Sequence, residues 1–283
     1  AYQQSQLTIG NFSARTVSVG DLFMGAIIPG IILVVCYAFY VVIRAYLSPN
    51  MAPSQEVEVV SGRWKIMLTS LLPPFVLISS VLGSILLGIA TPTEAAGVGA
   101  FGAILLALSK SSLTKKNLTD AVETTTEITA MVFMILLGSS IFSLVFRGFG
   151  GDDLITGIFT ELPGGAFGAV LVVMILIFLL GFILDFIQIT LVVVPIVGPA
   201  LLMLGIDPIW LGIMIAINLQ TSFLTPPFGF ALFYLRGVAP DSLATKDIYR
   251  GVIPFILIQI VVLIALAVFP ELVTALPNAV YGS

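Results

Sequence analysis

The sequence predicts an all-α integral membrane protein. Hydrophobic residues make up 59% of the chain and charged residues 9%, whereas soluble domains average about half and about a quarter. The mean hydropathy is +1.16. Apolar stretches recur at about the 20 residues that a helix needs to cross a bilayer. We therefore expect several transmembrane helices that contact membrane lipid.

Charge and residue types exclude several functional classes. The net charge is −4 and no long basic run is present, so nucleic acid is not an expected partner. The chain has no histidine and one cysteine, Cys36, which excludes an internal disulfide and a zinc or haem centre. Residues 148–151 lack the Lys and Ser or Thr of a phosphate-binding loop. We expect no nucleotide-driven pump, no enzyme and no organic cofactor.

One apolar stretch is twice as long as a span requires. It covers residues 164–204, and Gly181, Asp185 and Gln188 interrupt it. We interpret it as a helical hairpin with a polar tip, which either spans the membrane or re-enters it. Turn residues at 163–165 open it. The other expected helices cover residues 22–46, 66–90, 93–109, 126–146, 209–235 and 251–269.

Basic residues orient these helices. Nine of the 11 Lys and Arg residues lie in or beside the loops at 45–65, 110–119 and 236–250. Only Arg15 and Arg147 lie on the opposite side. The positive-inside rule makes the first side cytoplasmic, so residues 47–65 form a cytoplasmic linker and the C-terminus is predicted to be periplasmic.

A short internal similarity suggests a repeat. Asp21, Gly25 and Pro29 open the first helix with nearly the spacing of Asp247, Gly251 and Pro254 at the last one. Such short matches also arise by chance. If the repeat is real, the tail of a first repeat occupies residues 1–46 and a second repeat occupies residues 66–283.

A polar segment ending in two prolines interrupts the helix at 209–235. Residues 218–228 read Asn-Leu-Gln-Thr-Ser-Phe-Leu-Thr-Pro-Pro-Phe. Because lipid cannot pair free backbone groups, such a break must be buried in protein or line a wet cavity. Its hydroxyl, amide and carbonyl oxygens suit Na+, and a half-helix starting near Phe228 would attract an anion. The alternative is a proline kink whose hydroxyls bond back to the helix.

Two acidic residues are further candidates. Asp185 lies deep in an apolar stretch, where an acid usually faces protein, water or a cation, and Gln188 and Thr190 follow it. The alternative role for Asp185 is a helix cap. Glu94 follows Thr91 and Pro92 in the pattern of a capping box, which we favour over ion binding. Three glycines beyond it predict close helix packing: Gly97, Gly99 and Gly102.

Four ordered motifs resemble a known family, the large membrane subunit of tripartite ATP-independent periplasmic (TRAP) transporters. They are residues 88–97, 162–165, 181–185 and 218–229. The resemblance implies sodium-coupled import of a small organic acid across the bacterial inner membrane. It also implies a periplasmic substrate-binding protein and a small four-helix membrane subunit as partners. The implied fold is a pair of inverted repeats that move as an elevator, and most of the first repeat is absent here.

These observations define a candidate site. The metal-ligating candidates for Na+ are Asp185, Gln188, Thr221, Ser222 and Thr225, partly through backbone carbonyls. The substrate-binding candidates are Asn218, Thr225, Pro226 and Gly229. Two alternatives stay open. One is a sodium- or proton-coupled carboxylate transporter without a binding protein, and the other is a channel or structural membrane subunit.

Overall fold

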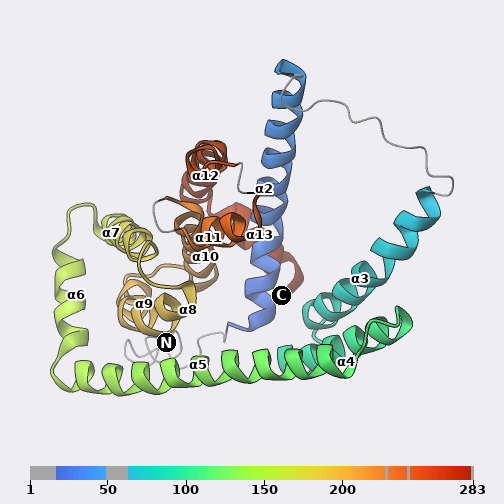
Figure 1. Cartoon of the computed structure of the whole chain (residues 1–283). Coiled ribbons are helices and arrows are strands. Elements are labelled where there is room, and N and C mark those ends of the chain that lie inside the picture. The colour runs from blue at the N-terminus through green and yellow to red at the C-terminus, as the bar shows by residue number, and fades with distance from the viewer. Residues whose placement is uncertain (1–16, 49–62, 227–228, 241–242, 282–283) are drawn as a thin grey trace. The chain divides into compact units, whose positions relative to one another are not determined.

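The computed structural model describes residues 17–48, 63–226, 229–240 and 243–281. All regular secondary structure in these ranges is helical (Figure 1). Within the described ranges, six stretches are long and apolar enough to cross a membrane: Val19–Leu47, Met67–Leu86, Pro92–Ser109, Lys115–Gly148, Phe186–Met203 and Thr245–Val268. The predicted all-α, multi-pass membrane fold is confirmed.

Several helices differ in extent from the sequence prediction. α5 (Lys115–Gly148) begins before the expected residue 126, and α12 (Thr245–Val268) begins before the expected residue 251. Both early turns are polar, so hydropathy alone does not detect them. Two short helices were not expected, α6 (Gly151–Glu161) and α13 (Glu271–Tyr281). Both carry acids in the first turn, which favour a helix N-terminus.

The chain divides into two compact units. One comprises residues 1–38 and 131–283, and the other comprises residues 39–130. The boundaries fall within α2 (Val19–Leu47) and α5.

The smaller unit contains α3 (Arg63–Leu86) packed against α4 (Pro92–Ser109). α4 begins with the expected capping box: Glu94 accepts the Thr91 backbone N–H at 2.8 Å. Two of the three predicted glycine contacts are present. Gly99 and Gly102 lie against the Val81 and Leu77 side chains of α3, whereas Gly97 faces open space.

The core of the larger unit is built around α10 (Pro208–Leu224). Ten of its 17 residues are buried, and it contacts α7 (Gly165–Leu180), α11 (Phe230–Val238), α12 and α13 (Figure 1). Asp207 caps its start by accepting the Trp210 backbone N–H at 2.8 Å. The Trp210 indole N–H donates to the Leu266 carbonyl of α12 at 2.8 Å. α10 is therefore fixed at its N-terminus before it reaches the polar segment.

The helical hairpin and the broken helix predicted from the sequence are both present. The first arm of the hairpin is α7. The second arm comprises α8 (Phe186–Gln188), a π-helical turn (Ile189–Val193) and α9 (Val194–Met203). The broken helix consists of α10 and α11.

A proline explains the π-helical turn. Pro195 has no N–H to donate to the carbonyl of Leu191, four residues earlier. The Val194 N–H instead reaches back five residues to Ile189. The Ser139 hydroxyl of α5 donates to the Leu191 carbonyl. The carbonyl that the proline leaves free is thus satisfied by another helix.

The hairpin opens at a tight glycine turn. Gly164 and Gly165 have φ angles of +91° and +58°, a region that L side chains rarely adopt. Gly168 lies directly on the Pro163 carbonyl, so that a Cβ atom at this position would overlap it. The opening of the hairpin therefore tolerates no side chain at this contact.

We predict that Gly168→Ala destabilises the protein by about 1–3 kcal/mol, because the backbone must shift to admit the methyl group. Gly157→Ala is the matched control. Gly157 also lies in a helix, but nothing lies within 4 Å of its Cβ position, so this change should be neutral or stabilising. Unfolding in detergent measures both, and equal midpoints for the two variants would contradict the observed contact.

Candidate functional site

The hairpin tip is a compact turn. Backbone N–H groups of Gly181 and Leu184 donate to Ile177 and Leu180 at 2.9 and 2.8 Å. Asp185 then starts the second arm in a capping box with Gln188, whose side-chain oxygen accepts the Asp185 N–H at 3.3 Å. Asp185 thus has the cap position that was the alternative to ion binding. Both side chains are half-buried, and Thr190, one turn further, is exposed.

The break in the polar helix is sharp. α10 ends at Leu224, and Thr225 is extended with φ −89° and ψ 127°. The Thr225 N–H turns back to the Ser222 carbonyl at 3.1 Å. α11 begins at Phe230, two residues after the expected start, while Pro227 and Phe228 lie outside the described residues.

Three hydroxyls at the break donate to carbonyls of their own helix. Thr221 donates to Ile217 at 2.8 Å, Ser222 to Leu219 at 2.9 Å and Thr225 to Thr221 at 2.7 Å. This back-bonding is what a proline kink predicts. A hydroxyl that donates its proton still has lone pairs on oxygen. These oxygens can therefore contact a cation without losing their hydrogen bonds.

Gly229 lies where backbone carbonyls converge. A Cβ atom there would lie 2.9 Å from the carbonyl oxygens of both Phe223 and Thr225. Gly229 is buried, and its N–H donates to Thr225 at 3.1 Å. The break thus concentrates carbonyl oxygens around a residue with no side chain. Pro226, beside them, is half-buried and offers no N–H.

The hairpin tip packs directly on the break. Gly181 contacts Ser222 so closely that a Cβ on Gly181 would overlap the serine side chain. One turn earlier on α10, the Asn218 amide donates to the Met174 carbonyl of α7 at 2.7 Å. Asn218, Thr221 and Ser222 are at most 2% exposed. Tertiary packing therefore joins two polar segments that are about 40 residues apart in the sequence.

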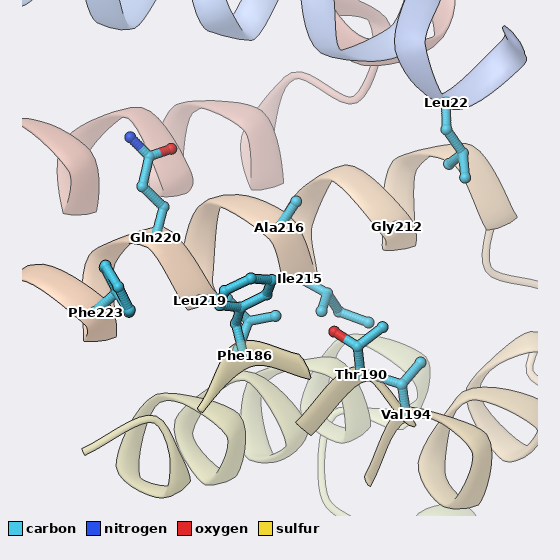
Figure 2. A pocket seen from close by; sticks show the side chains of 10 residues that line it. All are labelled: Leu22, Phe186, Thr190, Val194, Gly212, Ile215, Ala216, Leu219, Gln220 and Phe223. Atoms are coloured by element: carbon cyan, nitrogen blue, oxygen red, sulfur yellow. The ribbon is translucent and has the colours of Figure 1, made fainter. Parts of the chain in front are cut away.

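An apolar pocket of about 580 Å³ lies beside this contact. Figure 2 shows hairpin side chains from the second arm pointing toward α10, whose own side chains form the opposite wall. Its main walls are Phe186, Thr190 and Val194 on the hairpin and Ile215, Leu219 and Phe223 on α10.

The donors at the site are neutral oxygens with one acid nearby. Among the described residues, no group of three or more His, Cys, Asp or Glu side chains comes together. Hydroxyl, amide and carbonyl oxygens fit a hard monovalent cation, so the chemistry of the residues suits Na+.

Comparison with known proteins identifies the family of this chain. Residues 7–272 match the family model of the tripartite ATP-independent periplasmic transporter, DctM component. The chain belongs to this family of TRAP transporters.

Its relatives transport different compounds. The chain is 29% identical over 271 residues to the sialic acid TRAP transporter large permease protein of Vibrio cholerae. It is 30% identical over 273 residues to the C4-dicarboxylate TRAP transporter large permease protein of Pseudomonas aeruginosa. Each alignment covers 94% of this chain and 61% of the relative. The relatives are named as permeases, which are transporters rather than enzymes.

Several features of this TRAP-family site do not follow from sequence reasoning. Gly181 was expected only as an interruption of the hairpin, and its contact with Ser222 depends on how the two helices pack. Gly229 was a substrate candidate, but the convergence of carbonyls on it was not predicted. The role of Ser139 was not predicted, because the Leu191 carbonyl to which it donates lies 52 residues away in the sequence.

We predict that Gly181→Ala destabilises the protein by about 1–3 kcal/mol, because the new methyl group overlaps Ser222. Ser222→Gly removes the overlapping atoms, although glycine costs about 1 kcal/mol in a helix. The double variant should therefore lose less stability than the two single losses added together. Unfolding of the four proteins in detergent measures this coupling. Strict additivity would mean that tip and break do not touch.

Proposed function

We propose that this chain is part of a sodium-coupled importer of a small organic acid in the bacterial inner membrane. The observation that carries the proposal is the contact between the Gly181 tip and the buried hydroxyls of the broken helix. Broken helices that meet a partner element in the membrane are a common way for secondary transporters to hold ions and substrates.

The ion site would lie at the break. Thr221 and Ser222 are 1% exposed, and their hydroxyl protons are already donated, so only oxygen lone pairs face a ligand. Thr225 and nearby carbonyls add oxygens at the C-terminal end of α10, where the helix dipole is negative. Asp185 and Gln188 would complete the site or hold the tip in place. A desolvated Na+ would replace its lost water ligands with these oxygens.

The substrate carboxylate would bind at the α11 side of the break, whereas the ion would bind at the α10 side. α11 begins directly after Gly229, and the N-terminus of a helix attracts anions through its free N–H groups. Asn218, Thr225, Pro226 and Gly229 are the candidate binding residues. The bound Na+ would add positive charge nearby, so ion and substrate binding would reinforce each other.

The partners are part of the same proposal. The family is tripartite and periplasmic by its description, and the relatives are named as large permease proteins. We infer a small membrane subunit and a periplasmic substrate-binding protein as partners. The C-terminus would lie on the periplasmic side, because the basic loops favour the opposite side as cytoplasmic.

Uptake tests the proposal. The full-length protein with its two partners is placed in proteoliposomes, and uptake of labelled organic acids is compared under inward Na+ and K+ gradients. We expect uptake that requires both Na+ and the binding protein. Uptake without the binding protein would favour a sodium- or proton-coupled carboxylate transporter that needs no binding protein. Absence of uptake would favour a structural subunit, in which the hydroxyls and the Asp185 cap serve only folding.

Thr221→Val tests the ion site. Valine keeps the shape but removes an oxygen, and a lost contact of about 1.4 kcal/mol raises the half-saturating Na+ concentration tenfold. We therefore expect the half-saturating Na+ concentration for uptake to rise about tenfold or more. Thr274→Val is the control, since Thr274 also donates to a carbonyl four residues earlier, at Pro270 in the C-terminal segment. An equal effect of both variants would contradict a specific ion contact.

A further inference from the structure

We propose that the apolar pocket beside the tip holds the body of the transported acid. The substrate class would then be a monocarboxylate with an alkyl or aryl body, rather than a sugar acid or a dicarboxylate. This inference rests on the proposed function, because it takes the carboxylate to bind at the break.

The pocket begins where the candidate site ends. Phe186 follows Asp185 in the chain, and Phe223 follows Ser222. The two rings meet edge to face with centroids 6.2 Å apart, and both line the pocket. A molecule with its carboxylate at the break would therefore extend along an aromatic wall.

Polar groups are scarce along the walls. The side chains that line the pocket carry polar atoms only at Thr190 and Gln220, and in Figure 2 the Gln220 amide points away from the hairpin arm. Hydroxyl groups of a substrate that face this wall would find few hydrogen-bond partners, whereas an alkyl or aryl body would cover apolar surface there. A second carboxylate would meet no cation among the lining residues.

The size of the pocket is also suited to a small molecule. Its volume of about 580 Å³ lies within the range of about 300–1,000 Å³ that is typical of small-molecule sites. Leu22 of α2 lies against Gly212, where a Cβ atom would come within 2.9 Å of the leucine Cδ2. Figure 2 shows the Leu22 side chain directed toward α10 near Gly212. Leu22 and Phe223 thus both belong to the lining of the pocket.

The π-helical turn contributes to the wall. Thr190 belongs to this turn, and such turns often occur at functional sites because they redirect side chains. Thr190 therefore offers one hydrogen-bonding group within an otherwise apolar wall. A single 2-hydroxy or 2-oxo group on the substrate could be accommodated there.

Competition for uptake tests the substrate class. In the same proteoliposomes, unlabelled isovalerate, benzoate, gluconate and succinate compete at equal concentration with a labelled acid that is taken up. We expect isovalerate and benzoate to inhibit at least tenfold more strongly than gluconate and succinate. If gluconate or succinate competes equally well, the inference is wrong while the proposed function stands. If no acid is taken up with Na+, both are overturned.

A variant then tests the pocket itself. Ala216→Leu adds bulk to the lining on α10, and we expect it to weaken benzoate uptake at least tenfold while propionate uptake persists. Retained propionate uptake also shows that the variant folds. The matched control is Ala103→Leu, an exposed position on α4. Unchanged benzoate uptake by Ala216→Leu would overturn the assignment of this pocket, as would equal loss of benzoate and propionate uptake.

Discussion

The structure depends on one constraint, which is that backbone N–H and C=O groups inside a membrane must be paired within the protein. A straight helix meets this requirement by itself, but the hairpin tip, the π-helical turn and the break after Leu224 do not. Their backbone groups are paired by turns of the same segment or by a side chain of another helix. Ser139 donates to the carbonyl that Pro195 leaves free. At the break, the N–H groups of Thr225 and Gly229 donate to the carbonyls of Ser222 and Thr225.

The hydroxyls at the break serve this constraint and leave room for function. Thr221, Ser222 and Thr225 donate to carbonyls of α10, which holds the last turn of the helix together. The oxygens keep unused lone pairs, buried at Thr221 and Ser222 and half-buried at Thr225. The structural role of these side chains is therefore compatible with the ion-binding role that we propose for them. The same argument applies to Asp185, which caps α8 and still carries a half-buried carboxylate.

The relatives are named for compounds as different as sialic acid, C4-dicarboxylates and ectoine. A shared fold thus does not determine the substrate. In this chain the polar oxygens gather at the break, while the neighbouring walls are formed by Phe186, Ile215, Leu219 and Phe223. In our proposal, the break would bind the Na+ ion and the substrate carboxylate, and the pocket would discriminate between the apolar bodies of different substrates.

The sequence by itself determined the membrane class, the hairpin, the broken helix and the capping box at Thr91, because each leaves a local pattern of hydropathy, proline or spacing. It missed α6, α13 and the polar start of α5, since short or polar helices are invisible to a count of apolar residues. Only the tertiary structure decided that Gly181 packs against Ser222 and that the Asn218 amide donates to the Met174 carbonyl. It also decided that backbone carbonyls converge on Gly229. These contacts join segments distant in sequence or depend on backbone direction at the break. Their geometry is set by packing, which residue identity alone does not encode.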